Sequence, residues 1–302
     1  MTITSGNFAK ALWPGVKKWY AAAYGEHPLE WSQIFDQDSS GKAYEEDVQV
    51  SGLGLAPVKP QGSATSYDTM SQGFVQRYTH LTYSLGFIVT EEAKEDDQYD
   101  VVAKRGSKRL GFSMRQTQEV VAANVLNRAF NSAYAYGDGV ELLSAAHPNT
   151  AGGTFANELS VAADLSEASI EQACIDIMRF TDDRGLRIRV MPRCLIVPPE
   201  LAFDAERILK STLQNDTANN AINAVRSMGL FPDGVVVNHY LTDQDAFFIK
   251  TDCPDGLKAY MRRAPEVRTD NDFDTENAKF KASFRASWGA TDPRGIFGSP
   301  GA

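Results

Sequence analysis

The chain has 302 residues, of which 43% are hydrophobic, and a formal net charge of −9. This length and hydrophobic content suffice for one large folded domain or two moderate ones, which argues against a disordered protein. Proteins that bind nucleic acid present clustered Lys and Arg, so the net negative charge argues against a dedicated nucleic-acid-binding protein. The longest uncharged runs, such as 53–58, fall far short of the ~20 residues that cross a bilayer. The N-terminus carries no secretory pattern, so we expect neither a membrane span nor export.

The first 44 residues mix turn-forming residues with aromatic side chains and show no sustained period of 2 or 3.6. This composition predicts an extended arm. Its aromatic residues, among them Trp13, Trp19 and Trp31, need a surface that covers them. Two alternatives stay open: the arm covers a neighbouring subunit, or it packs on its own domain.

Residues 45–90 have the pattern of a long β-hairpin. Odd positions from Leu81 to Val89 are apolar or aromatic, which is the period-2 signature of a half-buried strand. The stretch 56–63 is rich in breakers and predicts a wide tip. Because a two-stranded ribbon is only marginally stable by itself in water, we expect one of this length to lie on another surface.

The longest helical signal runs between about residues 90 and 131. Apolar side chains recur there at steps of three and four on one face, and the start is acidic, as the helix macrodipole favours. Gly106 and Gly111 lie within this segment, and each costs roughly 1 kcal/mol relative to alanine. We therefore expect a helix that bends or breaks near its middle, with these two glycines as its flexible points.

The region after this helix mixes both kinds of element. Residues 136–143 predict a tight turn that enters a short strand. Ser166 is placed to cap a helix with one apolar stripe, formed by Ile170, Cys174 and Ile177.

Apolar runs in the last third of the chain predict the strands of a sheet. The central strands are 194–197, 235–237 and 247–249, and Pro199 suits the first turn of a helix after the first of them. Alternation in 257–261 and again in 280–286 predicts two antiparallel strands joined by an acidic turn. The fold class expected from all these elements is α+β.

Side chains that carry chemistry form no recognisable site. None of the four histidines has a second ligand at zinc spacing, and we interpret each as a turn or core histidine: His27, His80, His147 and His239. No nucleophile elbow, phosphate loop or dinucleotide fingerprint occurs, and the three cysteines form no Cys-x-x-Cys pair. The acidic run 270–276 lacks the central glycine of a calcium loop, so a solvated turn is the favoured interpretation. The sequence predicts no catalytic, cofactor-binding or metal-binding residue.

Three stretches are informative in combination, namely 137–148, 195–201, and 271–277 followed by 288–298. In this order they resemble the major capsid proteins of tailed bacteriophages, which have the Hong Kong ninety-seven-like fold. The resemblance covers nearly the whole chain. It implies an N-terminal arm, an extended β-hairpin loop, a peripheral domain with a long spine helix, and an axial domain.

Approximate bounds follow from the resemblance. The arm would be 1–44, the extended loop 45–90, the peripheral domain 91–150 with 256–302, and the axial domain 151–255. The last dozen residues would be able to return to the axial domain. The glycine-bearing helix would be the spine, and Gly106 and Gly111 would allow its curvature to change when a rounded precursor shell expands.

The resemblance also implies a function and partners. The chain would assemble with itself into hexamers and pentamers of an icosahedral virion shell, built in the host cytoplasm, with no enzymatic activity, no cofactor and no membrane partner. The shell would enclose double-stranded DNA without sequence-specific binding. Other expected partners are a separate scaffolding protein, a portal and, in some members, a cement protein. This chain enters the arm almost at once, so either the scaffold is a separate protein or the chain is already processed, and Met1 favours a separate scaffold.

Candidate contacts between subunits follow from these positions: Trp13, Trp19, Trp31, Pro57, Lys59, Asn271, Asp272 and Asp274. Some members lock the shell with an isopeptide bond between a lysine and an asparagine. Here Lys59 would join Asn271 or Asn277, helped by Glu276. Two rival hypotheses remain: an encapsulin-like nanocompartment shell with the same fold, and a soluble enzyme without a recognisable motif.

Overall fold

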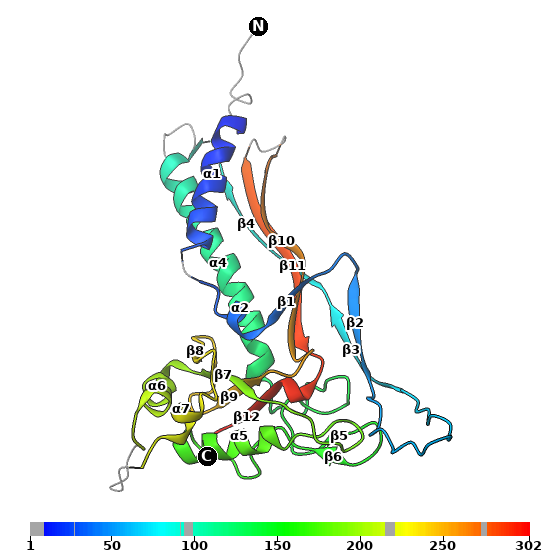
Figure 1. The fold of residues 1–302 in the computed structure, drawn as a ribbon. Coiled ribbons are helices and arrows are strands. Elements are labelled where there is room, and N and C mark those ends of the chain that lie inside the picture. The colour runs from blue at the N-terminus through cyan, green and yellow to red at the C-terminus, as the bar shows by residue number, and fades with distance from the viewer. Residues whose placement is uncertain (1–8, 27, 91, 94–98, 215–220, 273–276) are drawn as a thin grey trace.

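The computed structural model describes residues 9–26, 28–90, 92–93, 99–214, 221–272 and 277–302. Two four-stranded sheets, a two-stranded ribbon and several helices make up this part of the chain (Figure 1). The long helices and the first sheet form an elongated half, and the second sheet lies below them in the view. The α+β class predicted from the sequence is confirmed.

The first sheet is long and packs on two helices. Its strand order is β1 (Asp36–Ser39), β10 (Leu257–Asn271), β11 (Ala278–Ala290) and β4 (Leu81–Val89). From β11, Phe280 and Phe284 join Met114 of α4 (Tyr99–Asn127) in one buried cluster. Helix α1 (Ala9–Tyr24) runs along α4. The strands predicted from alternation are therefore present. The apolar face of β11 is buried under α4, whereas Leu81 and Leu85 of β4 stay exposed.

The second sheet lies at the other end of the molecule. Its order is β12 (Ile296–Ser299), β9 (Phe247–Thr251), β7 (Pro192–Val197) and β8 (Val235–Val237). Around it lie α5 (Glu167–Met178), the 3-10 turn η2 (Pro199–Leu201), α6 (Ala202–Lys210) and α7 (Ala224–Met228). Ser166 caps α5 as expected, since its hydroxyl accepts the amide of Ser169 at 3.1 Å. Short elements complete the fold: β5 (His147–Pro148), β6 (Thr154–Phe155) and η3 (Pro293–Gly295).

The N-terminal segment differs from the extended arm that its composition predicted. It contains helix α1 and a single further turn, α2 (Trp31–Ile34), followed by β1. The Glu119 carboxylate of α4 accepts the backbone amides of Glu30 and Trp31 at 2.8 and 3.0 Å, which fixes the start of α2. The sequence pattern failed here because alanines and an internal Pro14 obscure the period, while α1 gains its stability from packing on α4.

Two other predictions are also corrected. Residues 140–143 form no strand; Leu142 and Leu143 are buried, and the Leu143 amide donates to the Ala129 carbonyl at the end of the helical region. The hairpin is shorter than expected, because β4 leaves it and pairs with β11 instead. Both differences arise from contacts with distant segments that local pattern does not encode.

Helix α4 is unbroken at both of its glycines. A Cβ on Gly111 would lie 2.8 Å from the Tyr20 carbonyl oxygen of α1, and one on Gly106 would lie 2.8 Å from the Phe87 ring of β4. The absence of a side chain therefore lets α1 and β4 approach the helix closely. The proposed role of the two glycines as flexible points stays a prediction.

The remaining hairpin is a ribbon of β2 (Tyr44–Val50) and β3 (Gln72–Thr79), and residues 51–71 form its tip loop. Figure 1 shows the ribbon projecting sideways from the first sheet. A polar cluster fastens its base. The Asp47 carboxylate accepts hydrogen bonds from Lys258 Nζ at 2.8 Å, Tyr260 Oη at 2.9 Å and Thr291 Oγ1 at 2.8 Å.

The electrostatics of Asp47 reflect this setting. Burial by itself would raise the pKa of the carboxyl, but the hydrogen bonds from Lys258, Thr291 and Tyr260 outweigh burial and hold the pKa below its ordinary value. The ionised form is thus the form that the folded chain prefers. Asp47 therefore ties the ribbon to β10 and to the end of β11.

Gly111→Ala is expected to destabilise the chain, although alanine is the better helix former. The new methyl group would push α1 away from α4, and overpacking of this kind costs about 1–3 kcal/mol, against about 1 kcal/mol gained in helix propensity. Urea unfolding measures the difference. Gln116→Ala, at an exposed position of α4, is the matched control and should change stability little. A more stable Gly111→Ala variant would contradict the close packing of α1.

Asp47→Asn should lower the free energy of unfolding by about 1–3 kcal/mol near neutral pH, because a charge-assisted acceptor is lost. The folded-state pKa of Asp47 is depressed, so its stabilising contribution is present above the ordinary value of 3.8 and is lost as pH falls through the folded pKa. The difference in the free energy of unfolding between wild type and variant should therefore disappear at acid pH. Glu46→Gln, the exposed neighbour on β2, should show no such gap at any pH. A gap that is independent of pH would rule out the ionised carboxylate as the fastening group.

Candidate assembly interface

The tip loop of the ribbon exposes apolar side chains that nothing in the single chain covers. The exposed fractions of the side chains are 55% for Leu53, 81% for Leu55, 94% for Val58, 92% for Tyr67 and 64% for Met70. Contiguous apolar surface on a projecting element is typical of a surface that another protein covers. The tip loop is therefore the first candidate interface.

The base of the tip loop is held by a second polar cluster, which we call the latch: Asp68, Arg184, and the backbone of Gly54 and Thr69. Arg184 donates to the Asp68 carboxylate at 2.5 Å and to the Thr69 carbonyl at 2.6 Å, and the Gly54 amide donates to Asp68 at 2.8 Å. The Gly54 amide, followed by Arg184, lowers the pKa of Asp68 to about 2. The latch joins the tip loop to the loop between α5 and β7, so the loop has a defined position before any partner arrives.

The free edge of the first sheet is a second exposed surface. Strand β4 is the terminal strand in the order β1-β10-β11-β4. Its Leu81, Leu85 and Ile88 are 56%, 49% and 58% exposed. An edge strand with exposed apolar side chains offers both backbone and side-chain contacts to a neighbour.

The three tryptophans that were candidates for contacts between subunits lie in the two N-terminal helices. Trp31 is 3% exposed and its ring meets the ring of Trp288 edge-on at 5.7 Å. Trp19 is partly buried against the cluster under the first sheet. Trp13 lies in α1, but its side chain is outside the described residues. For Trp19 and Trp31, this packing supports the alternative in which the segment lies on its own chain.

The other candidates form two groups at opposite ends of the molecule. Pro57 and Lys59 are exposed on the tip loop, at the lower right of Figure 1. Asn271 ends β10 and Asp272 pairs with Lys279 at the β10–β11 turn, near the top of the figure. Asp274 and Glu276 lie outside the described residues. The two groups can therefore meet only between different chains, and the isopeptide link stays a prediction.

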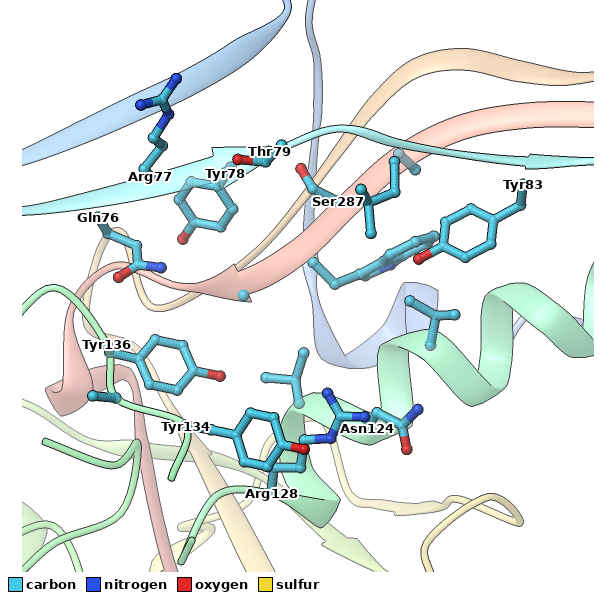
Figure 2. A pocket seen from close by; sticks show the side chains of 17 residues that line it. Gln76, Arg77, Tyr78, Thr79, Tyr83, Asn124, Arg128, Tyr134, Tyr136 and Ser287 are labelled. Atoms are coloured by element: carbon cyan, nitrogen blue, oxygen red, sulfur yellow. The ribbon is translucent and has the colours of Figure 1, made fainter. Parts of the chain in front are cut away.

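A pocket of about 340 Å³ lies at the base of the ribbon. Figure 2 shows Tyr134 and Tyr136, from the segment after α4, facing Tyr78 of β3 across it. Asn124 of α4 and Arg128, the first residue after that helix, lie at the side. The Arg128 guanidinium lies over the Tyr134 ring, 4.4 Å from its centroid. Burial raises the pKa of Tyr136 to about 12, so its hydroxyl stays protonated. This lining can stack and donate hydrogen bonds. The Ser287 hydroxyl in it lies 2.9 Å from Nδ1 of His80, and both side chains are buried.

Three of the histidines lie in the described part of the chain, and the ring of each one makes at least one hydrogen bond. His147 is buried between Asp138, at 2.6 Å, and Asn157, at 3.0 Å. His80 lies between the hydroxyls of Ser40 and Ser287, and His239 bonds to Glu30. The interpretation of these residues as turn or core histidines is confirmed; His27 lies outside the described residues.

Two further kinds of site are absent from the part of the chain that the structure describes. There, no group of three or more His, Cys, Asp or Glu side chains is arranged to hold a metal ion. Within the same residues, no helix combines the length and the apolar character that crossing a membrane requires.

Sequence reasoning missed the residues that position these surfaces. Asp47, Asp68 and Arg184 were not singled out for any contact, since their partners lie far away in the sequence. The only available signal was the Asp-Asp-Arg-Gly turn at 182–185, which indicates a turn but not what Arg184 binds.

Solved structures with a similar fold are capsids and related particles. A virus-like particle from Pyrococcus furiosus superimposes with a TM-score of 0.54 at 10% identity, covering 94% of this chain and 97% of that chain. The procapsid of bacteriophage JBD30 gives a TM-score of 0.53 at 13% sequence identity, covering 98% of this chain and 76% of that chain. The structure from Mycobacterium phage Che8 gives a TM-score of 0.52 at 14% sequence identity, covering 90% of this chain and 92% of that chain. At such identities the likeness shows the fold, which is the Hong Kong ninety-seven-like capsid fold.

No protein with a curated description matches the sequence significantly. A family model does match: the one described as phage capsid protein fits residues 74–298, well over half of the chain. The matched segment contains both sheets' central strands, α4 and most of β3. The chain therefore belongs to the phage capsid protein family.

Proposed function

We propose that this major capsid protein assembles into hexamers and pentamers that close an icosahedral shell around a phage genome. The observation that carries the proposal is the tip loop, which exposes apolar side chains on a ribbon fastened at its base. Self-assembly into a closed shell requires large interfaces between unlike surfaces of identical subunits. A projecting loop and an exposed sheet edge on the same chain supply two such surfaces.

The parts of the chain take the following proposed roles. Residues 1–44 form an N-terminal arm that includes α1. The extended loop, expected over 45–90, is the ribbon of β2 and β3 with its tip loop, because β4 pairs with β11. The peripheral domain is 91–150 with 256–302 and includes β4, and α4 is its spine. Residues 151–255 form the axial domain. The pairing of β12 with β9 supports a return of the last residues to that domain.

The partners and location are also part of the proposal. The shell belongs to the virion and is assembled in the host cytoplasm, with a separate scaffolding protein, a portal and a cement protein as further partners. The role is structural, without catalysis. DNA is enclosed rather than bound by sequence, which suits a chain of net charge −9.

Leu55→Asp combined with Val58→Asp should abolish shells while leaving the subunit folded. The two side chains are 81% and 94% exposed, so their replacement removes no core contact but places charge in a covered interface. Negative-stain electron microscopy of the purified wild-type chain should show closed shells, and the variant should show none. Val161→Asp, a similarly exposed apolar position outside the ribbon, is the control and should still assemble.

Several outcomes of this experiment would overturn the proposal. A wild-type chain that stays monomeric at high concentration would favour a soluble enzyme. Shells loaded with a cargo enzyme, produced in cells without a phage genome, would favour a nanocompartment. Normal shells from the double variant would show that the tip loop is not an interface.

Arg184→Ala should free the tip loop, because the guanidinium provides two of its fastening hydrogen bonds. Hydrogen–deuterium exchange of residues 52–70 should accelerate several-fold in the unassembled chain, and shell formation should slow. Arg193→Ala breaks a bidentate pair with Asp233 that does not involve the tip loop, and it serves as the control. The charge-swapped pair Arg184→Asp with Asp68→Arg should recover part of the protection. Unchanged exchange in Arg184→Ala would mean that the latch does not hold the loop.

A further inference from the structure

Helices α1 and α4 enclose a groove of about 600 Å³. Its lining combines two small apolar side chains, one exposed aromatic ring and several charged or polar groups: Ala22, Ala23, Glu26, Lys108, Arg109, Phe112 and Ser113. The Phe112 side chain is 53% exposed. The two alanines leave room for a second backbone to approach closely.

The charge of this groove is opposite to that of the chain as a whole. Lys108 and Arg109 lie in it, and Lys104 and Arg105 are exposed one turn earlier on α4. Residues three to four positions apart share a helix face, so these cations and Phe112 form one continuous stripe. Among the side chains that the structure describes, which do not include that of Asp100, no carboxylate forms an ion pair with any of the four cations. A concentration of positive charge on a chain of net charge −9 points to a negatively charged partner.

We propose that this groove docks an acidic amphipathic helix from a second protein during shell assembly. An apolar floor with a cationic rim matches a helix that has leucine-like residues on one face and carboxylates beside them. Double-stranded DNA keeps the faces of its bases stacked inside the duplex, so it would contact the cations through its phosphates and leave Phe112 uncovered. Glu26 at the groove adds direction: the carboxylates of the partner lie toward Lys104 to Arg109 and away from Glu26. This inference rests on the proposed shell function, because it assigns a surface to an assembly partner.

The test uses the full-length, unassembled chain and fluorescence anisotropy. The probe is a synthetic amphipathic peptide of about 20 residues with alternating leucine and glutamate faces, long enough for about five helical turns. A scrambled peptide of the same composition and a double-stranded DNA oligonucleotide are the comparison probes. The amphipathic peptide should bind most tightly, and its affinity should fall as ionic strength rises.

Variants separate the two halves of the groove. Lys108→Glu with Arg109→Glu should weaken peptide binding at least about tenfold, since two attractions become repulsions. Phe112→Ser should weaken it several-fold while leaving the salt dependence unchanged. Arg207→Glu with Lys210→Glu makes the same charge change on α6, and that control should bind the peptide as the wild type does.

Three results would overturn the inference. Equal binding of the scrambled peptide would reduce the groove to a patch of charge. DNA binding that depends on Lys108 and Arg109, without peptide binding, would assign the surface to nucleic acid. No binding of any probe would leave the groove without this role. Electron microscopy of shells from the same chain reports separately on the proposed function, because failure to assemble does not affect the anisotropy result.

Discussion

The packing of β11 against α4 is the contact on which the rest of the structure depends. Phe280 and Phe284 of β11 are buried with Met114 and Leu110 of α4. Strand β11 also pairs with β10 on one side and β4 on the other, so the sheet is built outward from it. With this sheet in place, α1 can lie along α4 and the ribbon can extend from β4. A subunit that must form several contacts with neighbours needs such a rigid body. Ordering a flexible segment at each interface would cost conformational entropy.

Two polar clusters then give the exposed ribbon a defined direction. Asp47 fastens its base to β10 and the end of β11, and the latch between Asp68 and Arg184 fastens its tip loop to the other half of the chain. A two-stranded ribbon gains little from its own pairing, so these fastenings supply the order that the strands lack. The tip loop is thereby held in place with its apolar side chains exposed, as the proposed contact with a neighbouring subunit requires. Presenting an ordered loop lowers the entropy that association must overcome.

The groove between α1 and α4 is another exposed surface with an apolar part. The ribbon exposes apolar side chains, which we propose contact identical chains, whereas the groove adds a cationic rim to its apolar floor. Apolar area alone does not discriminate among partners, and charge does. The two surfaces therefore suit partners of different chemistry on a single subunit.

The sequence by itself determined the elements whose apolar period is strong: strands 81–89 and 280–286, the stripe of α5 with its Ser166 cap, and the apolar strands of the second sheet. It also indicated the capsid fold through the order of its segments. Only the tertiary structure decided that residues 9–24 are helical, that β4 belongs to the sheet rather than the hairpin, and that Gly111 serves close packing. Local periodicity encodes which face of an element is buried. It does not encode the distant partner, such as Arg184 for Asp68, that fixes where the element lies.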